Sequence, residues 1–248
     1  MNIRSQLLAG AVLATGLSAC NQNASSEPHK HGIDAPDVAH TREDVELIIH
    51  AYLLENPEVV QEVMDILEER EKTAISDSLS SDERDATYGP KDAPITIVEY
   101  FDYNCGYCKR SVDWVLDQVD EGDGQVRVVF KELPILTEGS RLAASAAIAA
   151  KKQGKYLEFH RLLMAQKAGT LNSERIDELA ESIGLNVTRL HKDMESSETR
   201  DQILDIRDQA ITHGATSTPS FFVNGELIQG YDQAALEARL EELKTSLN

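Results

Sequence analysis

The sequence predicts an α/β fold in which a helical block is inserted into a small sheet, with an N-terminal helical segment before it. Three stretches support this: a strand–helix–strand order over residues 95–131, helical patterns over 139–213, and a strand–strand–helix order from residue 220 onwards. Apolar residues alternate in strands and recur every three or four residues in helices, which is the primary signal for each. We therefore expect residues 93–248 to form one domain, with the insertion at about 137–214.

The strands are short runs rich in β-branched and aromatic residues. Residues 95–101 (ITIVEYF) form the first run, and residues 125–131 (QVRVVFK) form a second that alternates between apolar and polar. Two further runs surround Asn224-Gly225, a strong signal for a two-residue hairpin turn. Asp232 is then placed to cap a last helix.

The composition limits the classes of function. The chain has 248 residues, 41% of them hydrophobic, which suffices for one domain of ordinary size and an appendage. The formal net charge is -19, so the chain lacks the basic face that nucleic-acid binding requires. Three cysteines are too few for a disulfide-stapled scaffold, and two of them form a close pair. We expect that pair to be chemically active.

Residues 1–20 are typical of a signal peptide. An apolar run from Leu7 to Leu17 is too short to span a membrane and ends in Leu-Ser-Ala-Cys. This ending resembles the bacterial lipoprotein box, which implies that Cys20 is lipidated. We therefore expect an exported protein of the periplasm or cell envelope, lipid-anchored through Cys20. The alternative is an ordinary signal peptide that is cleaved nearby.

A polar segment and a helical region follow the signal peptide. Residues 21–40 predict a flexible tether, in which scattered histidines are more simply solvated than metal-binding. Residues 41–74 predict two amphipathic helices, which begin at a capping box formed by Thr41 and Asp44. Such helices cannot bury their apolar faces alone. We expect residues 42–72 to form a homo-oligomer, the alternative being that they pack on their own domain.

Residues 75–92 are polar and end in Tyr-Gly-Pro, which indicates a linker or a continued solvated helix. We place the linker over this range and begin the main domain at residue 93.

The chemistry is expected at Cys105-Gly106-Tyr107-Cys108, which follows a strand and opens a helix. Cys105 lies at the helix N-terminus, where unpaired N–H groups favour a thiolate, so it is the expected nucleophile. Cys108 lies one turn later on the same face and is placed to resolve a mixed disulfide. Structural zinc needs four ligands, and the sequence has no second cysteine pair. We expect neither a metal nor a cofactor.

A second motif, Ser217-Thr218-Pro219-Ser220, stands just before the hairpin. With the cysteine pair, it resembles the thioredoxin superfamily. The resemblance implies a thioredoxin fold in which Pro219 is cis and faces the cysteines. It also implies that the backbone there pairs with an extended substrate chain.

The resemblance is closest to DsbA-like proteins, and within them to the ScsC-like branch with an N-terminal oligomerisation region. The segments that carry it are VEYFDYNCGYCKR, VFKELPIL, GKYLEFHRLL, TSTPSFFVNGELIQG and, near the N-terminus, VELIIHAYLLENPEVVQEVMDILEER. DsbA-like proteins carry a buried acid and a lysine near the resolving cysteine, and the resemblance assigns these to Glu99 and Lys131. Both residues are expected to move the proton of Cys108, the alternative being a structural ion pair. Thr218, before the proline, is of the type seen in isomerase-like members.

The expected function is therefore thiol–disulfide exchange on protein disulfides, as an isomerase or reductase. The expected partners are unfolded or misoxidised exported proteins and a membrane thiol reductase or oxidase. Two alternatives stay open. One is a monomeric oxidase that introduces disulfides, and the other is a copper-binding protein in which the two thiolates hold Cu(I).

Overall fold

The computed structural model describes residues 41–247. The predicted signal peptide, Cys20 and the tether of residues 21–40 lie outside the described residues. The chain divides into two units after residue 54, and each is described by itself. No helix within the described part is long and apolar enough to cross a membrane.

The first unit contributes one described helix, α1 (Arg42–Glu55). The predicted capping box starts it: the Thr41 backbone N–H donates to Asp44 Oδ2 (3.0 Å), and the Asp44 N–H donates to Thr41 Oγ1 (3.2 Å). None of the α1 residues is buried, and its large apolar side chains are more than a third exposed at six positions. These are Val45, Leu47, Ile48, Ile49, Tyr52 and Leu54.

The second unit is built on a five-stranded mixed sheet with the strand order β1-β3-β2-β4-β5. The strands are β1 (Ala86–Tyr88), β2 (Ile95–Phe101), β3 (Val126–Glu132), β4 (Ser220–Val223) and β5 (Glu226–Gln229). The central strand β2 runs parallel to β3 and antiparallel to β4. The first β-α-β unit and the C-terminal hairpin thus pair along β2. The strands predicted from the sequence therefore belong to one sheet.

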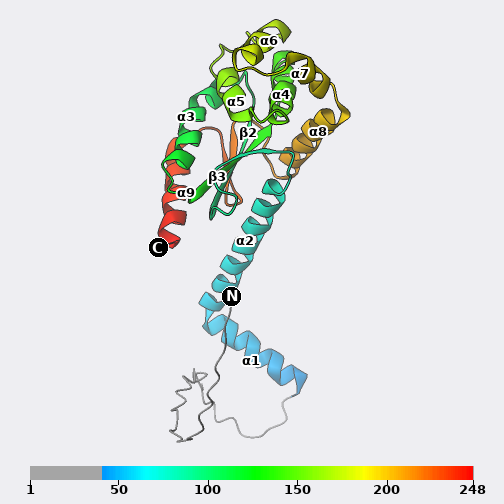
Figure 1. Ribbon diagram of the computed structural model, residues 1–248. Helices are drawn as coiled ribbons and strands as arrows, with labels where there is room; N and C mark the ends of the chain where they lie inside the picture. The colour runs from blue at the N-terminus through cyan, green and yellow to red at the C-terminus, as the bar shows by residue number, and fades with distance from the viewer. Residues whose placement is uncertain (1–40, 248) are drawn as a thin grey trace, which may run out of the picture. The chain divides into compact units, whose positions relative to one another are not determined.

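Helices cover both faces of this sheet, and Figure 1 shows α3 and α9 on one side and α8 on the other. The helices of this unit are α2 (Pro57–Ser80), α3 (Gly106–Asp120), α4 (Glu138–Lys151), α5 (Tyr156–Met164), α6 (Ser173–Ser182), α7 (Val187–Met194), α8 (Ser197–Thr212) and α9 (Gln233–Ser246). The five helices α4 to α8 make up the insertion between β3 and β4. This arrangement is a thioredoxin fold with an inserted helical domain, as the sequence predicted.

Alternation along the strands separates two hydrophobic clusters. On one face, Ile95, Ile97 and Phe101 of β2 pack with both cysteines of the pair, with α3 and α9, and with the insertion. On the other face, Val98 and Tyr100 pack with α8 and with the end of α2. The reactive cysteines therefore belong to the larger cluster, beneath the insertion helices.

The C-terminal end of α2 is docked on the second of these faces. Leu79 is fully buried there and Ile75 packs beside it. The β4–β5 turn approaches α2 so closely that a Cβ on Gly225 would lie 1.9 Å from the carbonyl oxygen of Lys72. Gly225 also has a φ of +84°, so both the turn and this contact require glycine.

This docking corrects the linker predicted over residues 75–92. Instead of a linker, α2 continues to Ser80, and residues 86–88 join the sheet as the edge strand β1. The segment looks polar in sequence because its core contacts come from four scattered residues, Ile75, Leu79, Ala86 and Tyr88.

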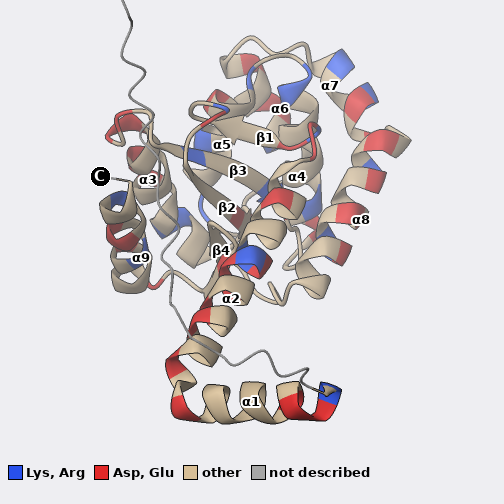
Figure 2. Cartoon of the chain, turned by 90° about the horizontal axis from the view of Figure 1, so that it is seen from below, with Lys and Arg blue, Asp and Glu red and all other residues tan. Residues whose placement is uncertain are grey.

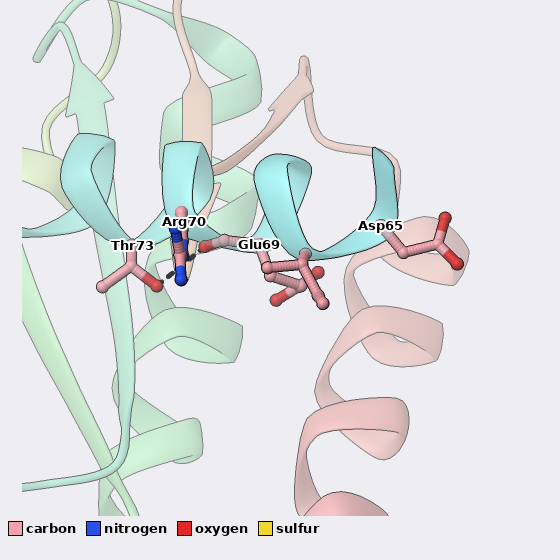
Figure 3. Close-up of a pocket in the computed structure, with 5 residues that line it drawn as sticks. Asp65, Glu69, Arg70 and Thr73 are labelled. Carbon is pink, nitrogen blue, oxygen red and sulfur yellow. Dashed lines mark hydrogen bonds between the residues drawn. The ribbon is translucent and has the colours of Figure 1, made fainter. Parts of the chain in front are cut away.

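The N-terminal part of α2 is exposed. Val60, Val63, Met64 and Leu67 follow one another at helical spacing and are 46–57% exposed. A shallow pocket on α2 is lined by residues of this helix alone, and Figure 3 shows Asp65, Glu69, Arg70 and Thr73 along it. The hydrogen bond drawn there joins Thr73 Oγ1 to the Glu69 carbonyl, which is ordinary bonding within a helix.

Acidic side chains are spread over the outer surface of the helices. Figure 2 shows Asp and Glu on α1, α2, α8 and α9, in keeping with the net charge of -19. The distribution favours solubility and provides no specific site by itself.

Candidate active site

Cys105 is the N-cap residue of α3, with an extended backbone (φ -76°, ψ 120°). The strand β2 ends at Phe101 and leads into a short loop that delivers Cys105 to the helix start. The Cys108 backbone N–H donates to Cys105 Sγ (3.4 Å), so the sulfur takes the place of a capping oxygen. Negative charge on Sγ is favoured at this position by the helix N-terminus.

The two thiols differ in exposure. Cys105 retains 6% of its surface exposed, and Cys108 is fully buried below it. Both are free thiols in the structure. Only Cys105 is therefore positioned for attack by or on an external sulfur.

The two thiols also differ in acidity. Hydrogen bonding from the Cys108 side chain, assisted by the Cys108 backbone and by Thr218, outweighs burial and lowers the pKa of Cys105 to about 5. Burial raises the pKa of Cys108 far above its ordinary value, and the thiol hydrogen bond and the charge of Glu99 act in the same direction. At neutral pH, Cys105 is the thiolate and Cys108 holds the proton.

Thr218 and Pro219 lie opposite Cys105, as the resemblance implied. The Thr218–Pro219 peptide bond is cis, which confirms that prediction. The Thr218 carbonyl oxygen is 3.2 Å from Cys105 Sγ and accepts its hydrogen when the thiol is protonated. Pro219 leads directly into β4, next to the central strand.

Asp102 holds the loop that precedes Cys105, a role that no local pattern in the sequence indicates. Its carboxylate accepts four hydrogen bonds, two at each oxygen. Oδ1 accepts from the Asn104 N–H (2.7 Å) and Ser140 Oγ (2.6 Å). Oδ2 accepts from the N–H groups of Ile135 (2.9 Å) and Leu136 (3.0 Å). Asp102 thus ties the loop before Cys105 to the start of the insertion.

Asn104 makes a second connection to the insertion. Its Nδ2 donates to Thr137 Oγ1 (2.9 Å) and Ser140 Oγ (3.0 Å) at the N-terminus of α4. Its Oδ1 accepts from the Gly169 N–H (2.8 Å) in the loop after α5. The only sequence signal for these roles was the position of two polar residues between a buried strand and the cysteine pair.

Tyr103, between these two residues, joins a buried polar cluster. Its hydroxyl donates to Glu132 Oε1 (3.0 Å) and also lies 3.0 Å from His160 Nδ1. Tyr156 donates to the same Glu132 oxygen (2.8 Å). Burial raises the pKa of Glu132 well above its ordinary value. Burial also lowers the pKa of His160 to about 3, so His160 is neutral at pH 7.

Glu99 lies on the cysteine face of the sheet. It is 1% exposed, and Ser111, one turn after Cys108, donates to Glu99 Oε1 (3.1 Å). Burial raises the pKa of Glu99 to about 8; the Ser111 hydrogen bond opposes this, and the charge of Cys105 adds to it. Glu99 is therefore a buried acid that titrates near neutral pH beside the two cysteines.

Lys131 does not lie beside Glu99 or Cys108, and the expectation that it does is wrong. In the β2–β3 register, Glu99 is opposite Phe130, and Lys131 is opposite Tyr100. Since neighbouring residues of a strand point to opposite faces, Lys131 lies on the far face of the sheet. There its ammonium group forms a buried ion pair with Asp85. Lys131 therefore secures the segment between α2 and β1.

Large apolar side chains are exposed in the cysteine motif and in the loop bonded to Asp102. Tyr107, within the pair, is 58% exposed, and the Arg110 guanidinium lies 4.0 Å from its ring centroid. Ile135 and Leu136, in the loop bonded to Asp102, are 46% and 52% exposed. Within residues 41–247, no group of three or more His, Cys, Asp or Glu side chains could hold a metal ion.

Family models match two adjacent parts of the chain. The model described as thioredoxin matches residues 81–242. The model described as the copper resistance protein ScsC N-terminal domain matches residues 42–74.

Several solved structures are similar to this chain. A thioredoxin-like oxidoreductase from Silicibacter pomeroyi is 39% identical, with a TM-score of 0.64, and covers 68% of this chain and 97% of its own. The catalytic domain of Proteus mirabilis ScsC is 25% identical (TM-score 0.61; 71% and 97% covered). A periplasmic thioredoxin-like protein from Salmonella enterica serovar Typhimurium is 27% identical (TM-score 0.60; 68% and 95% covered).

Curated relatives extend well beyond this chain. The Na(+)/H(+) antiporter NhaA 3 of Salinispora tropica is 33% identical over 159 residues, which are 63% of this chain and 24% of the antiporter. The NhaA antiporter of Herminiimonas arsenicoxydans is 33% identical over 161 residues, 64% of this chain and 25% of the antiporter. The chain thus spans about a quarter of the length of these relatives.

The hydrogen bond between the two thiols gives a testable pH dependence. Alkylation of Cys105 by iodoacetamide should rise with pH around a midpoint near 5, because the pKa of Cys105 is lowered to about 5. In Cys108→Ser the hydroxyl still donates, so the midpoint should stay close to this value. In Cys108→Ala the donor is lost, and the midpoint should move up by roughly one unit. Equal midpoints in the two variants would show that the side chain of residue 108 does not set the acidity of Cys105.

Proposed function

Because the chain belongs to the thioredoxin family, we propose that it is an exported thiol–disulfide oxidoreductase that acts on protein disulfides through Cys105 and Cys108. The observation that carries this proposal is the asymmetry of the pair. The Cys105 thiolate at the helix N-terminus keeps 6% of its surface exposed, and the protonated thiol of Cys108 lies fully buried one turn below it.

The reaction follows from this asymmetry. The Cys105 thiolate attacks one sulfur of a substrate disulfide and expels the other as a thiolate, which takes up a proton. Cys108 then loses its proton and attacks Cys105 Sγ. The mixed disulfide breaks, the Cys105–Cys108 disulfide forms, and the second substrate sulfur leaves as a thiol. The substrate disulfide gains two electrons, and the cysteine pair loses two.

We assign proton acceptance from Cys108 to Glu99. Cys108 is too deeply buried to release its proton to bulk water, and Glu99 is the carboxylate whose charge acts on it. A carboxyl group with a pKa of about 8 is partly ionised at neutral pH, so it both accepts and returns a proton there.

Disulfide isomerisation or reduction is the direction we favour. The support is Tyr107, which brings no positive charge to the thiolate, together with Thr218 before the cis proline. The exposed side chains of Tyr107, Ile135 and Leu136 suit apolar segments, which unfolded or misoxidised exported proteins expose. A membrane thiol reductase is the partner that would keep the pair reduced. A monomeric oxidase is the alternative within the same chemistry.

Self-association through residues 42–72 is the second part of the proposal. One support is the apolar stripe of α2, formed by the exposed side chains of Val60, Val63, Met64 and Leu67. The other is the match of residues 42–74 to an ScsC N-terminal domain. The same family is described as a copper resistance protein, so binding of copper by the two thiols is the alternative function. Two sulfur ligands alone rarely form a selective metal site. Lipid anchoring through Cys20 in the cell envelope completes the proposal.

The direction of exchange is tested with ribonuclease whose disulfides are scrambled. The reduced protein should restore ribonuclease activity, because the Cys105 thiolate attacks wrong disulfides and releases them to re-pair. The Cys105→Ser variant should restore none. Failure of the wild-type protein, combined with rapid oxidation of reduced ribonuclease by its disulfide form, would favour the oxidase alternative.

Glu99 is tested by the pH dependence of the second step. The rate at which Cys108 closes the internal disulfide should increase as pH rises through about 8, because ionised Glu99 accepts the proton. Glu99→Gln should lose that increase. Ser111→Ala removes a hydrogen bond that lowers the pKa of Glu99, so it should move the increase to higher pH. An unchanged profile in Glu99→Gln would remove Glu99 from the mechanism.

Self-association is tested by light scattering of the purified protein. Val63→Lys and Leu67→Lys should convert oligomers to monomers, because each places a charge within the apolar stripe. Gln61→Lys is the control, since it adds the same charge on the polar side of α2, where Gln61 bonds to Asp65. A wild-type protein that is already monomeric would contradict this part of the proposal.

A further inference from the structure

Acidic residues are distributed unevenly around the cysteine pair. Asp and Glu account for 43 of the 248 residues, about one in six. Four segments nevertheless contain neither: residues 103–112, which include the cysteines, and residues 133–137, 159–173 and 214–220. In a chain with a net charge of -19, such gaps become meaningful if the four segments lie together.

The residues on either side of the cysteine motif connect the first of these segments with the second and third. Asn104 Nδ2 donates to Thr137 Oγ1 (2.9 Å), and Asn104 Oδ1 accepts from the Gly169 N–H (2.8 Å). The Lys109 Nζ donates to the Met164 carbonyl oxygen (3.1 Å) at the end of α5. Segments that are far apart in the sequence therefore border the motif on both sides.

The fourth segment lies against the reactive thiol itself, since Cys105 Sγ is 3.2 Å from the Thr218 carbonyl oxygen. All four segments without Asp or Glu thus meet around the cysteine pair. We call the surface that they form together the acid-free surface.

Two exposed cations belong to the acid-free surface, Arg110 and Lys167. The Arg110 guanidinium lies 4.0 Å from the centroid of the Tyr107 ring, which leaves its N–H groups free to bind an anion. Lys167 opens the turn that contains Gly169, because its carbonyl oxygen accepts from the Thr170 N–H (3.2 Å). Within residues 41–247, neither Arg110 nor Lys167 forms an ion pair.

The acids that border the first two segments do not cancel these charges. Asp102 and Glu132 are 1% and 2% exposed and are hydrogen-bonded inside the domain. Glu138 is exposed but forms an ion pair with Arg141. Asp113 is exposed one turn further along α3. Acidic side chains instead lie on α2, α8 and α9, as Figure 2 shows.

We propose that the acid-free surface, through Arg110 and Lys167, selects polypeptide substrates in which acidic side chains flank the disulfide-bonded cysteine. The acidic remainder of the protein repels such a segment, whereas the two cations attract it, so the substrate is oriented towards the cysteine pair. Arg110 and Lys167 determine specificity here and take no part in the exchange between sulfurs. The proposal rests on the proposed dithiol exchange.

The test uses three matched peptides, each a symmetrical disulfide whose cysteine is flanked by Asp, by Asn or by Lys. The reduced full-length protein gives two electrons to each disulfide, which becomes two peptide thiols while the Cys105–Cys108 disulfide forms. The rate of thiol release is divided by the rate of the same peptide with dithiothreitol, which removes the reactivity of the peptide itself. The Asp peptide should react fastest and the Lys peptide slowest. Raising the salt from about 0.02 M to about 0.5 M should bring the rates together, because salt screens exposed charges.

Variants then locate the preference. Arg110→Gln and Lys167→Gln should each lower the ratio of the Asp to the Lys rate roughly two- to fivefold, the effect expected of one exposed charge pair. Arg110→Lys should keep the ratio, because it keeps the charge. Lys91→Gln is the control. Lys91 is also exposed, but it precedes β2, at the end of that strand away from Cys105.

Three results would overturn the proposal. One is a wild-type protein that reduces the Asp peptide no faster than the Lys peptide after the correction. Another is a ratio that changes in neither Arg110→Gln nor Lys167→Gln. The third is an equal loss in Lys91→Gln, since net charge would then set the preference. A wild-type protein that reduces none of the three peptides would instead refute the proposed function.

Discussion

The first turn of α3 has to be fixed against the sheet, because every property of the cysteine pair depends on where that turn begins. Tyr103 fixes it through a hydrogen bond to Glu132 at the end of β3, and Asp102 and Asn104 fix it through hydrogen bonds to the start of the insertion and to the loop after α5. A buried carboxylate is costly without partners, so the four hydrogen bonds accepted by Asp102 specify one arrangement of the loop. The acidity of Cys105 is therefore a property of the whole domain as well as of a four-residue motif.

The two faces of the sheet have different roles: one carries the reactive cysteines, and the other holds the segment that follows α2. On one face, Glu99 and Ser111 lie with the cysteines, in a cluster that excludes water and shifts the pKa of each buried group. On the other face, the Lys131–Asp85 ion pair and Leu79 hold the segment that enters from α2. A buried pair contributes little net stability, since desolvation offsets its attraction, but leaving one partner alone would be costly. This pair therefore specifies how the segment is attached.

Much of the fold could be predicted from local patterns. Strand and helix periodicity, the Asn224-Gly225 turn, the cysteine spacing and Pro219 each carry their signal within a few residues. Lys131 was misplaced for a different reason. Alternation along β3 shows which of its residues share a face of the sheet. Only the register between β3 and β2 shows which residue of β3 lies opposite Glu99, and that residue is Phe130. The roles of Asp102 and Asn104 depend on partners more than 30 residues away, so no local pattern contained them.

The unbroken course of α2 has a consequence for assembly. A helix of 24 residues is about 36 Å long, and only its C-terminal end, near Leu79 and Gly225, is seated on the sheet. If copies of the chain associate through the N-terminal end of α2, the length of this helix sets the distance between the junction and each catalytic domain. Each residue of the helix adds about 1.5 Å to that distance, so adding or removing one turn would change it by about 5 Å. The length of α2 would then determine which cysteines of one substrate protein can reach the active sites of two neighbouring copies.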